Sequence, residues 1–180
     1  MSLRRLRMPP TAVVVAVLVA VLVGPLGSGE QARAGVEPRT TAAALMIPAG
    51  AFIAASDDLD YLGDGAVVIT YNDGTLVAPL SFPVPVVSIR RITMYVLDES
   101  ADNDACLYLF RGDPAAGSTL RLGEVCTTGA DPTDPQAWAT TDIGPRQVNT
   151  AARGAYLSLT LKDGVKVYGV KINYNYETTG

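Results

Sequence analysis

The chain has 180 residues, of which 14 are Lys or Arg, 18 are Asp or Glu and none is His, so its formal net charge is −4. The lack of histidine excludes Ser-His-Asp and Cys-His nucleophiles, imidazole proton transfer near neutral pH and nearly all catalytic zinc sites. An acidic chain without a basic run is also a poor nucleic-acid binder, because neutralisation of phosphates supplies most of that affinity.

Residues 1–34 have the pattern of a secretory signal peptide. A basic head with three arginines precedes an apolar run from Ala12 to Val23, and the A-x-A motif formed by Ala32 and Ala34 predicts cleavage after Ala34. As a helix this run would be roughly 18 Å long, too short to cross a hydrocarbon core of about 30 Å. We therefore predict a secreted, extracellular protein whose mature form has no membrane span.

The mature chain is expected to form one domain. Cleavage removes four Arg and one Glu, which leaves 146 residues with 10 basic and 17 acidic side chains and a net charge of −7. A chain of this length buries roughly two thirds of its unfolded surface. We expect a linker that leads into the first strand at 35–44 and a single β-domain at 45–180.

Alternation of apolar and polar residues dominates the mature chain, and no stretch has the apolar stripe of a helix. The clearest case is 156–161, where Leu157, Leu159 and Leu161 share one face. We expect about eight to ten short strands, a number that favours an antiparallel sandwich or barrel over βαβ units. The expected strands are 41–47, 66–71, 75–80, 88–98, 104–111, 119–126, 137–143, 156–161 and 165–176.

Turn residues predict how several of these strands are connected. Asn72-Asp73-Gly74 predicts a hairpin of 66–71 with 75–80, and Asp163-Gly164 predicts one of 156–161 with 165–176. In the last strand, one side is expected to carry Tyr168, Val170, Ile172, Tyr174 and Tyr176. The prolines at 83 and 85 forbid a central strand and predict a crossing or edge segment.

Cys106 and Cys126 are the two cysteines of the chain. In an oxidising compartment such a pair is usually a disulfide, and the alternative is two buried free thiols. The cysteines lie in two expected strands on either side of a turn at 113–118. A hairpin there would bring the cysteines face to face, so the disulfide would fix its register.

The same hairpin predicts further cross-strand pairs. Folding about residue 116 pairs Tyr108 with Glu124, Phe110 with Leu122, and Arg111 with Arg121. The last pair is unfavourable because like charges would lie opposite each other, and a small bulge near the turn would relieve it.

Several segments together resemble a known type of protein. The segments are 47–52 (IPAGAF), 77–80 (VAPL), 91–98 (RITMYVLD), 106–111 (CLYLFR) and 167–174 (VYGVKINY). They are similar to small secreted bacterial jelly-roll-like β-sandwich proteins of unknown function, over most of residues 45–176. The resemblance implies a jelly-roll-like sandwich and brings no catalytic motif.

The densest acidic run is a candidate calcium site. Calcium takes six to eight oxygen ligands, and Asp98, Asp102, Asn103 and Asp104 offer such oxygens between two expected strands. The run lacks the residue order of an EF-hand loop, and a solvated turn with local side-chain hydrogen bonds is the alternative. No other cofactor is predicted.

Aromatic residues are candidates for sugar binding. An exposed aromatic ring can stack on a sugar face, and Trp138 with Tyr61, Tyr71, Tyr174 or Tyr176 would form such a platform. The alternative is that these rings pack in the core or at its rim.

These observations favour a secreted, non-enzymatic β-sandwich that acts as a structural or interaction module with an extracellular protein or glycan. The alternative is an extracellular carbohydrate-binding module, stabilised by calcium or not. Paired carboxylates leave a glycosidase as a further alternative. A homo-oligomer is compatible with a jelly roll, and an exposed apolar sheet face would indicate it.

Overall fold

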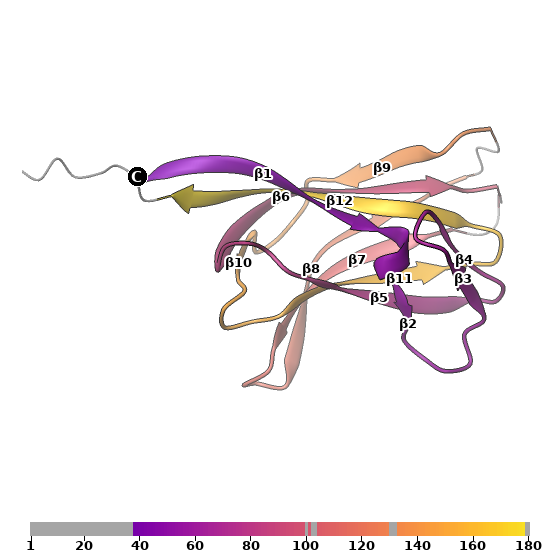
Figure 1. Cartoon of the computed structure of the whole chain (residues 1–180), viewed down its shortest axis with the longest axis horizontal. Coiled ribbons are helices and arrows are strands. Elements are labelled where there is room, and N and C mark those ends of the chain that lie inside the picture. The colour runs from indigo at the N-terminus through magenta and orange to yellow at the C-terminus, as the bar shows by residue number, and fades with distance from the viewer. Residues whose placement is uncertain (1–37, 100, 102–103, 130–132, 179–180) are drawn as a thin grey trace, which may run out of the picture. The chain divides into compact units, whose positions relative to one another are not determined.

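The structure is a computed structural model that describes residues 38–99, 101, 104–129 and 133–178. The predicted signal peptide at 1–34 lies outside these residues. The described residues form twelve strands in two antiparallel sheets that make two layers of a β-sandwich (Figure 1). The predicted all-β, jelly-roll-like sandwich is confirmed.

The seven-stranded sheet is built around two long strands. Its strands are β1 (Arg39–Pro48), β3 (Tyr61–Gly63), β4 (Val68–Thr70), β6 (Val86–Leu97), β9 (Gln136–Thr140), β10 (Gln147–Asn149) and β12 (Lys166–Thr178). β12 pairs with β6 on one side and with both β1 and β4 on the other. β9 and β10 share the other side of β6.

The five-stranded sheet has the order β2-β5-β11-β7-β8. Its strands are β2 (Ile53–Ala54), β5 (Gly74–Leu80), β7 (Cys106–Asp113), β8 (Ser118–Cys126) and β11 (Ala155–Leu161). A single turn of 3₁₀ helix, η1 (Ala49–Ala51), connects β1 to β2. The strands that sequence patterns missed, β2, β3 and β10, have two or three residues each, which is too short for a readable alternation.

The core lies between the two sheets. β11 contributes Leu157, Leu159 and Leu161, which are fully buried as predicted, and β6 contributes Ile92, Met94 and Val96 from the other sheet. Burial of a side chain of this size stabilises the fold by roughly 1.5–3 kcal/mol. The alternate residues of the same strands face outward, and this fixes which side chains are available to a ligand.

The hairpin predicted at Asn72-Asp73-Gly74 is wrong, because β4 and β5 lie in different sheets. The side chain of Asn72 accepts a hydrogen bond from the backbone N–H of Asp60 at 3.2 Å and donates one to the carbonyl of Asp58 at 3.3 Å. Asn72 therefore holds a loop that lies more than ten positions earlier in the chain. After this turn the chain does not return along β4 but crosses to the other sheet.

The hairpin predicted at Asp163-Gly164 is also wrong, since β11 belongs to the five-stranded sheet and β12 to the seven-stranded one. The register of β12 shifts between Val167 and Gly169. As a result Val167 is fully buried and Tyr168 is 37% exposed, against the predicted alternation. The proline segment at 81–85 does form a crossing, from β5 to β6, as predicted.

Within the described ranges, no helix is long and apolar enough to cross a bilayer.

Candidate functional site

The aromatic residues expected to form a sugar-binding platform do not share an exposed face. Trp138 of β9 lies opposite Met94 of β6, whose side chain is fully buried, so the indole is on the inner face and packs against the core. Tyr174 is only 4% exposed, and its ring meets that of Phe82 edge to face at 5.0 Å.

The remaining tyrosines of that set are distributed over the domain. Tyr61 is paired with the fully buried Thr70 and packs partly against the core. Tyr176 is half-buried, with its ring 6.1 Å from that of Tyr174. Tyr71 alone among the five is mainly exposed, at 55%. The structure thus brings together only Tyr174 and Tyr176, on the inner face.

The acidic run has a structural partner. The hydroxyl of Thr127 donates a hydrogen bond of 2.7 Å to Oδ2 of Asp98, and both residues are buried. The same hydroxyl accepts from the N–H of Ala105 at 2.9 Å. Asp98 therefore holds the end of β6 to the residue that follows β8.

Of the other candidate calcium ligands, Asp104 is exposed, and Asp102 and Asn103 lie outside the described residues. In the ranges that the structure describes, no three acidic or cysteine side chains are grouped as metal ligands would be.

A different set of aromatic side chains lies on the outer face of the five-stranded sheet. In β7 and β11, Leu107, Leu109 and Leu157 are fully buried. Because side chains alternate along a strand, Tyr108, Phe110 and Tyr156 point away from the core. All three are half-buried. We call Tyr108, Phe110 and Tyr156 the outer aromatic cluster.

Strand register arranges this face in rows. β11, β7 and β8 lie side by side, and each row takes one residue from each strand. The rows are Tyr156-Phe110-Arg121, Ser158-Tyr108-Glu124 and Thr160-Cys106-Cys126. The outer aromatic cluster is therefore bordered by charged side chains on β8 and by hydroxyls on β11.

The rings of the cluster are in mutual contact. Phe110 and Tyr156 are nearly parallel, with centroids 5.2 Å apart and planes at 15°. Tyr108 is tilted by 44° to Phe110 at 6.3 Å. The guanidinium carbon of Arg121 lies 5.7 Å from the centroid of the Tyr108 ring, within the range of a cation–π interaction. Contact on a shared sheet face limits the rotamers of these rings before any ligand binds.

A bulge in β8 places Arg121 on this face. Gly123 pairs with Leu109 and Arg121 pairs with Phe110, so Leu122 is the extra residue and is buried at 3% exposure. The predicted pair of Phe110 with Leu122 is wrong for this reason. The bulge also pairs Arg111 with Leu120, which removes the predicted clash of like charges.

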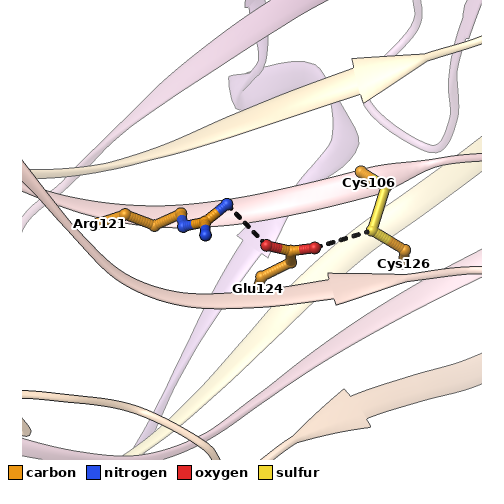
Figure 2. Close-up of polar contacts among 4 residues, drawn as sticks. All are labelled: Cys106, Arg121, Glu124 and Cys126. Atoms are coloured by element: carbon orange, nitrogen blue, oxygen red, sulfur yellow. Dashed lines mark hydrogen bonds and ion pairs between the residues drawn. A yellow bond between two sulfur atoms is a disulfide. The ribbon is translucent and has the colours of Figure 1, made fainter.

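The disulfide fixes the next row, as predicted. Cys106 and Cys126 are bonded directly across β7 and β8, with Cα atoms 4.1 Å apart. Figure 2 shows Glu124 between this disulfide and Arg121, with Oε2 2.7 Å from Nη1 of Arg121 and Oε1 3.7 Å from Sγ of Cys126. A disulfide sulfur carries no hydrogen, so the second interaction is a contact only. The exposed ion pair adds little stability but orients both side chains.

A polar cleft of about 510 Å³ continues from the cluster along the edge of β8. It is lined by Arg121, Leu122, Gly123, Glu124, Cys126, Thr140, Asp142 and Gly144. Arg121 and Glu124 thus border both the outer aromatic cluster and the cleft. The combined site offers ring surfaces next to a guanidinium donor, carboxylate acceptors and a hydroxyl.

Gly123 allows the segment with Asp142 to approach β8. A Cβ atom at Gly123 would lie 3.2 Å from the carbonyl oxygen of Asp142 and 3.4 Å from a side-chain carbon of Ile143. The N–H of Gly144 donates to the carbonyl of Leu122 at 2.8 Å and closes this contact. The far wall of the cleft is therefore anchored by backbone contacts.

Sequence reasoning missed the outer aromatic cluster, although part of its signal was readable. Tyr108 and Phe110 occupy outward positions of an alternating strand, as Tyr156 does in another. Their proximity depends on the pairing of β7 with β11, whereas the turn chemistry at Asp163-Gly164 indicated β12 as the partner of β11.

No family model matches the sequence, and no curated protein does either. Solved structures similar to the chain include the CBM36-1 domain of a xylanase from the hindgut metagenome of Trinervitermes trinervoides. The identity is 13% and the TM-score 0.46, covering 72% of this chain and 96% of that one. The C-terminal CBM6 of the laminarinase LamC from Zobellia galactanivorans is 18% identical at a TM-score of 0.45, covering 72% of this chain and 98% of that one.

A tryptic core variant of Cry1Da from Bacillus thuringiensis is another similar structure, 10% identical at a TM-score of 0.45, covering 69% of this chain and 22% of that one. At such TM-scores none of these likenesses transfers a site residue to this chain, and its function has to be inferred from its own side chains.

Proposed function

We propose that this domain is a non-catalytic, extracellular glycan-binding module whose ligand lies across the outer aromatic cluster and the cleft along β8. The observation that carries the proposal is the nearly parallel pair of Phe110 and Tyr156, 5.2 Å apart on the outer face of a sheet. The extracellular location depends on the export signal predicted at 1–34.

The chemistry of a saccharide matches this face. One face of a pyranose ring presents C–H groups, which are attracted to the negative face of an aromatic ring. Its hydroxyls need both donors and acceptors, which Arg121, Glu124 and Asp142 supply at the edge of the cluster. Binding sites of this kind combine an apolar surface with a few fixed polar groups.

The position of the rings supports a binding role over a structural one. The core faces of β7 and β11 are already filled by leucines, so the outer rings add little to the sandwich interior. Three contiguous aromatic side chains on a solvent-facing sheet are typical of an interaction surface. This favours the glycan-binding alternative over a purely structural module.

The test is glycan binding by the purified protein and by the double variant Phe110→Ala/Tyr156→Ala, measured on a glycan array and then by calorimetry. We expect the double variant to bind at least tenfold more weakly, a loss of about 1.4 kcal/mol or more. Tyr71→Ala is the matched control, because it removes an exposed ring far along the chain from the cluster, and it should bind as the parent does.

Two results would contradict the proposal. One is no binding to any glycan on an array that includes neutral and charged polysaccharides. The other is glycan binding that Tyr71→Ala weakens as much as the double variant does. Circular dichroism of each variant establishes that loss of binding is not loss of folding.

A further inference from the structure

The outer face of the seven-stranded sheet contains a second bulge, at two consecutive arginines. Ile89 pairs with Tyr174 and Arg91 pairs with Asn173, so Arg90 is an extra residue in β6. Ile89 and Ile92 are both fully buried, and Arg90 and Arg91 between them are both exposed. In a regular strand, one of two consecutive residues would face the core. The bulge instead leaves both arginines accessible to solvent.

A cleft of about 480 Å³ lies beside this bulge, where β1, β6, β10 and β12 meet. Its wall includes Arg90 and polar side chains from each of these strands. The polar residues that line it are Thr40, Ser88, Gln147, Asn175 and Glu177. Ser88 pairs with both Gln147 and Asn175, so these three lie in one row across the sheet.

Asn175 orients Arg90. With the amide of Asn175 turned so that its oxygen faces the guanidinium, Nε of Arg90 donates to it at 3.2 Å and the amide nitrogen donates to the carbonyl of Tyr174 at 3.3 Å. This bond uses Nε only. Among the residues that the structure describes, the two terminal nitrogens of Arg90 have no hydrogen-bond partner, so they can donate side by side to two oxygens of a carboxylate or a sulfate.

In the described ranges, neither of these two arginines forms an ion pair with a side chain. Among the residues that the structure describes, ion pairs neutralise four cations, Arg121, Arg153, Lys162 and Lys166, whereas Arg39, Arg111, Arg146 and Lys171 have no such pair. Neither Arg90 nor Arg91 has such a pair in the same ranges, although Glu177 also lines the cleft. Arg90 and Arg91 differ from the other unpaired cations in being adjacent in the chain and both exposed, so within the described part of the domain they offer two neighbouring positive charges to an external anion.

We propose that this cleft is a second binding site, specific for the anionic group of an acidic polysaccharide. Arg90 binds the carboxylate or sulfate through its terminal nitrogens, Arg91 adds a second positive charge, and Ser88 and Gln147 hydrogen-bond the neighbouring hydroxyls. The site is on the sheet opposite the outer aromatic cluster and does not rest on the proposed function.

The test is binding of the purified protein to polygalacturonate, which carries carboxylates, and to dextran sulfate, with neutral dextran for comparison. We expect binding to at least one charged polymer and none to dextran. Arg90→Gln should weaken that binding at least tenfold. Arg90→Lys should also weaken it, because an ammonium keeps the charge but not the planar pair of donors.

The matched controls are Arg153→Gln, which removes an arginine elsewhere on the domain, and the cluster variant Phe110→Ala/Tyr156→Ala. Neither should change binding to the charged polymers. The proposal is overturned if neither polymer binds at low salt, or if Arg153→Gln weakens binding as much as Arg90→Gln. Binding to polygalacturonate would identify the anionic group as a carboxylate, and binding to dextran sulfate would identify it as a sulfate. Because the variant Phe110→Ala/Tyr156→Ala should lose only binding at the outer aromatic cluster, it shows whether the two sites act independently.

Discussion

The hydroxyl of Thr127 makes two hydrogen bonds directly after the end of β8. Thr127 is fully buried, its hydroxyl donates a hydrogen bond to Asp98 and accepts one from the N–H of Ala105, and its own N–H donates to the carbonyl of Ala105 at 2.9 Å. The hydroxyl therefore satisfies a buried carboxylate and a buried backbone donor at once. Loss of a partner for such groups costs more than the net value of the bond itself.

We expect Thr127→Val to lower the free energy of unfolding by about 2–3 kcal/mol, because the shape is kept while both hydrogen bonds of the hydroxyl are lost. Urea unfolding measured by circular dichroism checks this. The control is Thr128→Val at the adjacent exposed position, where a surface change should stay within about 0.5 kcal/mol. Equal unfolding midpoints for the two variants would contradict the role given to Thr127.

For single residues, the sequence indicates which side chains could form a site but not where those side chains point. Asp98 was grouped with its acidic neighbours as an oxygen ligand, while the structure turns its carboxylate to Thr127, 29 positions away. Trp138 was a candidate for an exposed ring, while its strand position opposite Met94 directs it inward. Both outcomes depend on long-range strand pairing, which no local pattern contains.

Among the elements, the β7–β8 hairpin was the most predictable. Its turn chemistry, strand alternation and cysteine spacing agreed, and the cysteines pair as predicted. The hairpins predicted for β4–β5 and β11–β12 failed, although their turn residues were as favourable. Turn chemistry specifies a change of direction, and whether the next strand returns to the same sheet depends on the rest of the sandwich.

The disulfide is expected to contribute to the stability of this hairpin and of the domain. Its cysteines are 20 residues apart, and closing a loop of that size in the unfolded chain corresponds to about 3 kcal/mol. We predict that Cys106→Ala/Cys126→Ala lowers the free energy of unfolding by about that amount in urea. The reduced parent protein should unfold at a similar urea concentration. A variant as stable as the oxidised parent would show that strand pairing alone holds the register.

For the molecule as a whole, carboxylates in turns and loops make the free energy of unfolding depend on pH. The backbone N–H groups of Val67 and Ala66 donate to Asp64 and lower the pKa of its carboxyl. Lys162 likewise lowers the pKa of Asp73, and the hydroxyl of Ser56 lowers the pKa of Asp58. Each depressed pKa contributes stability above the ordinary value of 3.8 and loses it as pH falls through the value in the folded state.

We therefore expect the urea midpoint to fall as pH is lowered through the ordinary value of 3.8 and below it, because these carboxylates then become protonated. Asp64→Asn removes one titrating group and keeps an oxygen acceptor, so its midpoint should depend less steeply on pH. A midpoint that does not change over this range, or a variant with the slope of the parent, would contradict the prediction.

The position of β12 in the sequence delays completion of the seven-stranded sheet during synthesis. It is the last strand, yet it pairs with β1, β4 and β6, and Arg39 at the start of β1 lies opposite Thr178 at its end. Until residues 166–178 have been synthesised, β1 and β6 have no common neighbour and the seven-stranded sheet has no centre. This layer of the sandwich therefore stays incomplete during synthesis until residues 166–178 have left the ribosome.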